Sequence, residues 1–331
     1  MTKSTTRETA DIAGVVGKNA IINGNFDIWQ RATSQTVTGY GSDDRWINSV
    51  SGSTQAVSRQ AFTLGQTVVP NNPKYYSRTV VSSVAGAGNL AIKFQKIEGV
   101  ETFAGTTATV SFWAKADANK NIAIEFTQSF GTGGTDPAPS ANVLSIGVTT
   151  VSLTTSWVKH TVSVAVPSIA SKVLGTDGND FLTLIFWMDA GSNYNARTNS
   201  LGQQSGTFEF SQVQMEAGSV ATTFEPRSVG QEMALCQRYF QSTGVLAFFN
   251  VARFSSGSAG LPLNFLHFEN GMRASPTLST SGTFTTGTGY QGTPGFSNIT
   301  SHGCRISGSV SISAGAINYI HGGTVLMSAE L

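Results

Sequence analysis

Residues 109–116 read Thr-Val-Ser-Phe-Trp-Ala-Lys-Ala, an alternation of apolar and polar side chains. Because successive side chains of a β-strand point to opposite faces of its sheet, this pattern predicts a strand with one buried face. Segments 122–130, 157–166 and 181–188 continue the alternation, and glycine-rich clusters at 131–134 and 175–180 separate them. Strands joined by turns, with no helices between them, predict an all-β fold built as an antiparallel sandwich.

The composition of the 331-residue chain excludes several classes of partner. Charged residues make up 12% of it, and 20 Lys and Arg are balanced by 19 Asp and Glu. Without an excess of cations to neutralise phosphates, we expect no binding of nucleic acid. No apolar run is long enough for a membrane span, so we expect no membrane insertion. Two cysteines, Cys236 and Cys304, make neither a disulfide framework nor a zinc site, and we expect free thiols.

The composition and the residue patterns of the sequence indicate four parts. Residues 1–20 are a polar leader, either a floppy terminus or a segment that attaches to a partner. The sandwich occupies residues 21–226. Residues 227–241 are predicted to form a linker helix, with Ser228 as N-cap and Val229, Met233, Cys236 and Phe240 as its apolar stripe. A second β-rich domain follows at 242–331.

The C-terminal region is unusually poor in charge. From Val229 onward the 103 residues hold four Arg, three Glu, no Lys and no Asp, yet eleven Phe and Tyr. A lone small domain exposes much of its surface and needs charge for solubility. We therefore expect part of this surface to be buried between copies of the chain in a homo-oligomer, with three-fold closure as one option.

No catalytic constellation is visible, and we expect no enzymatic activity, no catalytic residues, no metal and no cofactor. Glycine-rich matches to a dinucleotide fingerprint at 86–91 and 287–292 lack the helix that must follow them, so both are turns. The four histidines have no partners at metal-ligand spacing. Glu125 and Asp189 could face a common groove, as glycoside hydrolysis requires, or be solvated strand-end carboxylates.

Aromatic residues are the better functional candidates. Trp113 and Trp187 lie on strand faces opposite their aliphatic or aromatic neighbours, where flat π surfaces could stack on sugar rings. They could instead form a second layer of core or an intersubunit contact. We include Glu125 with them as a candidate glycan-binding residue. The turn-rich loop 281–298 adds Tyr290 and Phe296, as a receptor contact or as an ordinary loop.

An ordered set of motifs resembles a family of bacteriophage tail-fibre and receptor-binding proteins. The set opens with Ile21-Ile22-Asn23-Gly24-Asn25-Phe26-Asp27-Ile28-Trp29-Gln30-Arg31. It continues with Asp44-Arg45-Trp46, Ser111–Ala116, Thr155-Ser156-Trp157, Gly178-Asn179-Asp180, Gln212–Gly218, Ala234–Tyr239 and Met272–Thr277. The resemblance implies a virion protein of the phage tail or baseplate, typically a homotrimer, made in the host cytoplasm. Residues 1–20 would attach it to a tail or baseplate protein, and its distal end would bind host surface polysaccharide.

The first domain also resembles jelly-roll carbohydrate-binding modules. Some of these modules hold a structural calcium with acids from their first and last strands. Asp27 matches the first position, but Ser211 and Gln212 stand where the other acids would be. Two other functions stay open: a purely structural virion component without a glycan site, and a polysaccharide depolymerase. Depolymerases of this class usually need a long repetitive β-helix, and no internal period is present.

Overall fold

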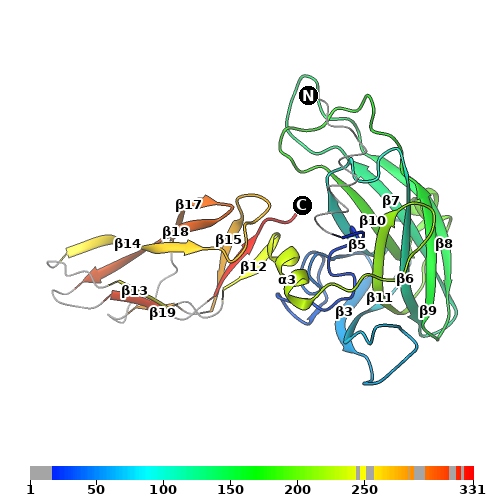
Figure 1. Ribbon diagram of the computed structural model, residues 1–331, viewed down its shortest axis with the longest axis horizontal. Helices are drawn as coiled ribbons and strands as arrows, with labels where there is room; N and C mark the ends of the chain where they lie inside the picture. Colours follow the sequence, from blue (N-terminus) through cyan, green and yellow to red (C-terminus); the bar gives the residue numbers. More distant parts are fainter. Residues whose placement is uncertain are drawn as a thin grey trace. The chain divides into compact units, whose positions relative to one another are not determined.

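The computed structural model describes residues 17–243, 247–250, 257–282, 284–286, 295–312, 318–321 and 324–331. The chain divides into two compact units, one reaching Glu232 and including Leu331, the other spanning Met233–Glu330. Figure 1 shows two β-sheets facing each other in the first unit. None of the helices in the described part of the chain is long and apolar enough to cross a membrane.

The first unit is an antiparallel jelly-roll sandwich, which confirms the predicted fold class. Its six-stranded sheet runs, in spatial order, β1 (Ser34–Gln35), β3 (Thr54–Ala61), β4 (Tyr75–Ser82), β11 (Gly206–Ala217), β6 (Thr107–Ala116) and β9 (Val158–Ala165). The five-stranded sheet runs β2 (Ile47–Ser51), β5 (Leu90–Glu98), β10 (Phe181–Ala190), β7 (Lys120–Ser129) and β8 (Val143–Leu153).

The core lies between these two sheets, on the faces that the alternation predicts. Phe112 of β6, Phe186 of β10 and Phe210 of β11 are fully buried there. The ring centroid of Phe186 lies 5.0 Å from that of Phe112 and 5.0 Å from that of Phe210. Burial of three such rings is a large part of the hydrophobic stabilisation of the sandwich. Val110, Phe112 and Ala114 of β6 are all fully buried, which confirms the buried face that the alternation of residues 109–116 predicts.

The segment around Gly24 packs closely against β11, the last strand of the first unit in sequence order. A side chain at Gly24 would place its Cβ 2.0 Å from the Val213 carbonyl oxygen, so only glycine fits at this approach. Val213 N–H donates to the Gly24 carbonyl, and the Asn23 side-chain amide donates to the carbonyls of Ile28 and Asp44. The Asn-Gly motif therefore closes the sandwich by joining its first segment to β11.

A buried ion pair sits between the sheets at the corner formed by residues 43–46. The side chains of Lys93, in β5, and Asp43 are both fully buried. The Lys93 ammonium donates a hydrogen bond to Asp43 Oδ2 and forms an ion pair with it. Asp43 also accepts hydrogen bonds from Ser77 Oγ at 2.9 Å and from Asn48 Nδ2 at 2.8 Å. Burial lowers the pKa of the Lys93 ammonium, and the Asp43 carboxylate opposes that shift. The corner is held by polar contacts rather than by apolar packing alone.

Helix α3 (Val229–Gln237) begins where predicted, with Ser228 Oγ accepting from Gln231 N–H at 3.3 Å. It ends before the predicted Gln241 because β12 (Phe240–Ser242) pairs with β20 (Thr324–Ser328) instead. Cys236 and Phe240 of the predicted stripe are buried, but Val229 is 64% exposed. Cys236 and Cys304 are not joined in a disulfide, and both are buried.

The second unit is β-rich, as predicted. Its described strands form three antiparallel three-stranded sheets. They are β12-β20-β15 (Thr277–Ser281), β13 (Ala247–Asn250)-β19 (Asn318–His321)-β16 (Thr285–Thr286), and β14 (Gly257–His267)-β18 (Gly303–Ile312)-β17 (Gly295–Thr300). A small core that includes Phe268, Met272, Cys304 and Val325 holds part of this unit together.

Candidate functional site: an aromatic platform on the six-stranded sheet

Trp113 lies where the sequence places it, on the outward face of β6. Its side chain is half-buried, and its neighbours in register are Ser211 of β11 and Lys159 of β9. Among the described residues, nothing accepts a hydrogen bond from its indole N–H. Trp113 therefore remains a candidate for contact with a ligand.

The prediction of an exposed Trp187 is wrong. The side chain points outward from β10, but it is only 1% exposed. Its N–H donates to Glu125 Oε2 at 2.9 Å, its ring centroid lies 5.1 Å from that of Tyr194, and the Arg197 guanidinium lies 5.0 Å from its centroid. Residues 191–201 fold over the five-stranded sheet here. Trp187 is thus part of a second layer of core, the alternative stated above.

Glu125 is not a solvated carboxylate, nor is it open to a groove. Its side chain is fully buried and accepts from Arg197 Nε at 2.7 Å and Nη2 at 2.9 Å, and from Ser145 N–H at 2.9 Å. Asp189 is likewise buried, and it accepts from the hydroxyls of Ser53 and Ser83. Both carboxylates have structural partners, so neither is placed for acid–base chemistry on a sugar.

Tyr290 and Phe296, the two candidates from the loop 281–298, differ in what the structure shows of them. Tyr290 lies outside the described residues. Phe296, in β17, is half-buried and packs against the core of the second unit. Binding by this loop stays a prediction.

We expect Arg197→Met to destabilise the protein without weakening a glycan complex. The substitution leaves Glu125 buried without its cation and uncovers Trp187, which costs about 1–3 kcal/mol. Thermal unfolding measures the loss of stability. Titration with a polysaccharide that binds the wild-type protein measures the affinity. Lost affinity at an unchanged melting temperature would place the site on the five-stranded sheet instead.

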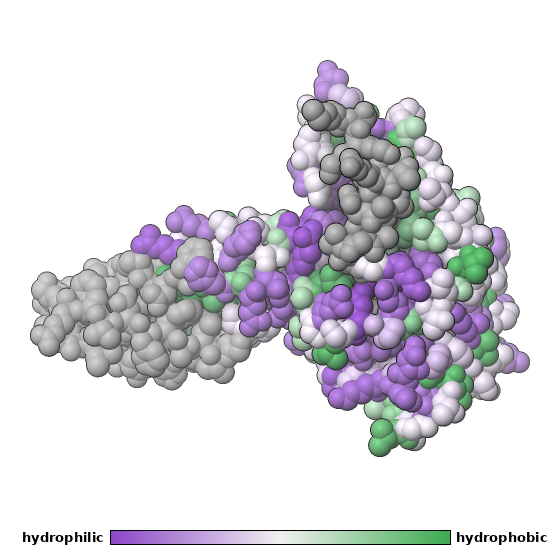
Figure 2. Space-filling view, in the orientation of Figure 1, coloured by the Kyte–Doolittle hydropathy of each residue, from purple (hydrophilic) through white to green (hydrophobic). Residues whose placement is uncertain are grey.

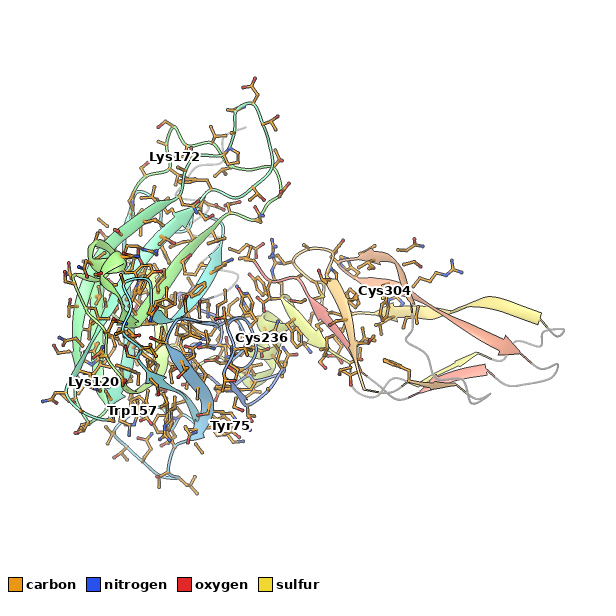
Figure 3. The ribbon with its side chains drawn as sticks, turned by 180° about the vertical axis from the view of Figure 1, so that it is seen from behind. Tyr75, Lys120, Trp157, Lys172, Cys236 and Cys304 are labelled. Atoms are coloured by element: carbon orange, nitrogen blue, oxygen red, sulfur yellow. The ribbon has the colours of Figure 1, made fainter. Side chains whose placement is uncertain are left out.

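Three aromatic rings that the sequence analysis did not single out meet on the outward face of the six-stranded sheet. Phe62 follows β3, Tyr76 is the second residue of β4, and Trp157 precedes β9. Their ring centroids lie 4.8 Å apart for Phe62 and Tyr76, 5.3 Å for Phe62 and Trp157, and 5.2 Å for Tyr76 and Trp157. We call Phe62, Tyr76 and Trp157 the aromatic platform. Figure 3 labels Trp157 at the end of the unit far from Lys172.

A row of charged side chains crosses the sheet beside the aromatic platform. Glu209 of β11 stands in register between Arg78 of β4 and Lys115 of β6. Its carboxylate accepts from Arg78 Nε at 2.6 Å and from Lys115 Nζ at 2.9 Å. The Lys115 ammonium also lies 5.4 Å from the Trp157 ring centroid. The row thus lies beside three rings that are inclined to one another, of which Tyr76 is buried and Phe62 and Trp157 are half-buried.

The Tyr76 hydroxyl joins the charged row to the aromatic rings. Burial, and then the Glu209 carboxylate, raise the pKa of Tyr76, so its hydroxyl stays protonated at neutral pH. It accepts from Arg78 Nη2 at 3.3 Å, and no described residue accepts its own proton. The hydroxyl proton therefore has no acceptor in the part of the chain that the structure describes, although the tyrosine side chain is buried. Rings for stacking beside a few fixed polar groups are the usual elements of a specific binding site.

The aromatic platform escaped the sequence analysis because its rings come from three distant places. Tyr76 lies on β4, whereas Phe62 and Trp157 lie just outside strands, where alternation assigns no face. The one available signal was Trp157, which belongs to the motif Thr155-Ser156-Trp157. Nothing local indicated that Phe62 would reach it.

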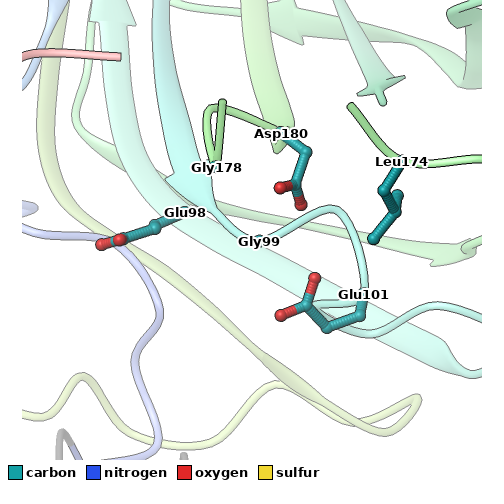
Figure 4. Close-up of a pocket in the computed structure, with 6 residues that line it drawn as sticks. All are labelled: Glu98, Gly99, Glu101, Leu174, Gly178 and Asp180. Atoms are coloured by element: carbon teal, nitrogen blue, oxygen red, sulfur yellow. The ribbon is translucent and has the colours of Figure 1, made fainter. Parts of the chain in front are cut away.

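A pocket elsewhere on the first unit has different chemistry. This pocket of about 400 Å³ is lined by Glu98, Gly99, Glu101, Leu174, Gly178 and Asp180 (Figure 4). Its lining has three carboxylates and no aromatic ring. Within the described residues, no group of three or more His, Cys, Asp or Glu side chains could hold a metal ion. The pocket therefore offers neither a stacking surface nor a metal centre.

The calcium position implied by the resemblance is not supported by its donors. Asp27 supplies one carboxylate, and Ser211 and Gln212 supply none. Gln212 instead donates to the Pro70 carbonyl at 2.6 Å. Calcium takes about 6–8 oxygen ligands, with carboxylates prominent among them. The residues present do not fit that ion.

No protein-family model and no curated protein matches the sequence. Solved structures with a similar fold include carbohydrate-binding proteins and a phage tailspike domain. A putative sugar-binding protein from Bacteroides thetaiotaomicron is 14% identical with a TM-score of 0.35, over 61% of this chain and 100% of that one. A family 11 carbohydrate-binding module from Clostridium thermocellum, in complex with a mixed-linked tetrasaccharide, is 10% identical with a TM-score of 0.31, over 57% and 98%.

The tailspike match is the enzymatically active domain of tailspike protein 4 from bacteriophage CBA120. It is 13% identical with a TM-score of 0.34, and it covers 61% of this chain but 22% of the tailspike.

Proposed function

We propose that this protein binds carbohydrate through the aromatic platform. The observation that carries the proposal is the meeting of Phe62, Tyr76 and Trp157 beside fixed polar groups on an outward sheet face. The apolar C–H faces of a sugar stack on such rings, while its hydroxyls need donors and acceptors at the ring edge. Arg78 donates to both Glu209 and the Tyr76 hydroxyl, and in this proposal Glu209 accepts from sugar hydroxyls while Arg78 and the Tyr76 hydroxyl donate to sugar oxygens. Trp113 extends the same face, and we include it in the site.

We propose that the biological setting is a virion, with the chain acting as a tail-fibre or baseplate-attached receptor-binding protein. The ordered motifs from Ile21 to Thr277 support this proposal. In this setting residues 1–20 attach to the tail, the charge-poor second unit is buried in a homotrimer, and the ligand is host surface polysaccharide. The protein adheres to this polysaccharide and does not cleave it.

The alternative of a depolymerase needs two carboxylates facing one sugar. The platform has one carboxylate, Glu209, and it is held by Arg78 and Lys115. A purely structural virion role would leave the aromatic platform as a contact for another protein. Polysaccharide binding, depolymerase activity and a purely structural role predict different results in the following experiment.

We expect the purified full-length protein to bind host cells, and purified surface polysaccharide to compete with that binding. Flow cytometry with labelled protein measures the binding, and chromatography of the incubated polysaccharide detects any released oligosaccharide. Binding with competition and without release is the expected result. No cell binding would favour the purely structural role, and released oligosaccharide would favour the enzyme.

A further inference from the structure

Two buried carboxylates lie near opposite ends of the strand pair β3–β4, on the face that points into the sandwich. Asp189 of β10 accepts hydrogen bonds from Ser53 Oγ, just before β3, at 2.6 Å and from Ser83 Oγ, just after β4, at 2.8 Å. Asp43 accepts from Ser77 Oγ, near the start of β4, at 2.9 Å. Polar groups are therefore present at both ends of this part of the interior, which lies between the two facing sheets (Figure 1).

Two rows of inward side chains separate the two carboxylates. In the register of β3 and β4, Thr79 pairs with Val57 and Gln55 pairs with Val81. Directly paired residues share a face of the sheet, and so do alternate residues of one strand. Thr79 follows Ser77 by two residues, so Thr79 points inward with it. Val81 belongs to the main core, so its partner Gln55 also points inward.

Gln55 and Thr79 have buried polar atoms that no part of the described chain satisfies. Neither the oxygen nor the nitrogen of the Gln55 amide, nor the Thr79 hydroxyl, forms a hydrogen bond with a described residue. Gln55 is 4% exposed and Thr79 is fully buried, so bulk solvent does not reach these atoms. A polar group buried without a hydrogen bond destabilises a fold, and nearly all such groups in proteins have a partner. The three atoms therefore need a partner that is not among the described residues.

Gln95 of β5 shows the contrast within the same interior. This side chain is also buried, but its Oε1 accepts from Ile22 N–H at 2.8 Å and its Nε2 donates to the Ile22 carbonyl at 2.8 Å. Both ends of the Gln95 amide are thus paired with backbone. Gln55 has the same amide at similar burial and neither of these contacts.

We propose that ordered water binds inside the sandwich between Gln55 and Thr79. A buried water makes about three hydrogen bonds to polar groups that lack other partners, which is the number of atoms available here. Water can donate to the amide oxygen and accept from the amide nitrogen, whereas a metal ion would leave the nitrogen unpaired. The water site is internal and independent of carbohydrate binding.

The Asn48 side chain extends this site toward the five-stranded sheet. Its Nδ2 donates to Asp43 at 2.8 Å, while its Oδ1 is buried and has no partner among the described residues. Asp43 also accepts from Ser77, which is two residues from Thr79 on the same face. A water on Asn48 Oδ1 would therefore continue the polar contacts from β4 to β2, and so from one sheet to the other.

The direct test is a crystal structure of the full-length protein at a resolution that shows ordered solvent. We expect density for at least one water within hydrogen-bond distance of both the Thr79 hydroxyl and the Gln55 amide. In solution, NMR spectra selective for water contacts should connect the Gln55 side-chain amide protons with a long-lived water. A Gln55 amide bonded directly to protein atoms, or left unpaired without water, would overturn the proposal.

Unfolding temperatures give a second test, because a hydrated and a dry interior predict opposite signs. With bound water, Thr79→Val and Gln55→Met each remove partners of that water, so both should lower the melting temperature. The double variant should lose less than the sum of the two single losses, since the same water is lost only once. In a dry interior each substitution would instead remove an unpaired polar group and raise the melting temperature.

Two further variants serve as controls. Gln95→Met removes an amide that is paired within the protein, so it should lower the melting temperature in either case and calibrate the size of such a loss. Thr79→Ser keeps the hydroxyl and should retain the crystallographic water. If Gln55→Met does not fold, Thr79→Val still decides the question, because it exchanges one hydroxyl for a methyl group. A Thr79→Val protein that melts above the wild type would refute the water site.

Discussion

Trp157→Ala should reduce the affinity for polysaccharide by about thirtyfold or more, the largest binding effect that we expect of any single substitution. The indole contacts Phe62 and Tyr76 and lies under the Lys115 ammonium. Its removal therefore deletes the largest ring of the platform and loosens the other two. Titration calorimetry with a polysaccharide that binds the wild type measures the change.

Two variants keep this prediction specific. Trp157→Phe retains a ring and should lose much less affinity than the alanine variant. Leu174→Ala truncates another exposed apolar side chain, 43% exposed and located at the acidic pocket, and should bind as wild type does. Circular dichroism melting separates lost binding from lost folding. Wild-type affinity in a folded Trp157→Ala protein would move the site away from this sheet.

Lys93→Met should lower the free energy of unfolding by about 3–5 kcal/mol, because it leaves Asp43 buried without its cation. For a unit of this size that is a fall in melting temperature on the order of 10 °C. Methionine has a similar length, so lost packing contributes little. The remaining side-chain donors to the Asp43 carboxylate, which are Ser42, Ser77 and Asn48, do not carry a positive charge. Calorimetric or denaturant unfolding measures the effect.

The double variant Asp43→Asn with Lys93→Met should recover most of this loss, since it removes the uncompensated charge. Lys172→Met, at an exposed position, should change stability by less than about 0.5 kcal/mol. A Lys93→Met protein as stable as the wild type would contradict a buried ion pair between these residues.

Exposed apolar side chains are scattered over the first unit, and this explains why sequence alone did not locate the site. Leu64 and Val68 are 101% and 58% exposed in the loop between β3 and β4. On the face shown in Figure 2, hydrophobic and hydrophilic residues are intermixed. Single exposed apolar residues are normal on protein surfaces and do not mark a site. Only the meeting of three rings distinguishes the platform from this background.

In strand β5, alternation predicts which face of the sheet each side chain points to, but it does not predict which side chains are buried. Ile92 and Phe94 point away from the main core and pack with Trp187 in the second apolar layer. Lys93 and Gln95 point inward and are buried. Lys93 lies inside because Asp43, fifty residues earlier, provides its counter-charge. No pattern within β5 contains that information.

By itself, the sequence determined four strands of the first unit (β6, β7, β9 and β10), the inward faces of β6 and β7, the beginning of α3 and the all-β class. These features depend on neighbours one to four residues apart, whose directions follow from backbone geometry. The tertiary structure decided which outward aromatic residues remain available. Residues 191–201 cover Trp187, whereas Phe62, Tyr76 and Trp157 converge from three separate segments. Exposure depends on what distant parts of the chain pack against a side chain, and alternation along one strand cannot specify that.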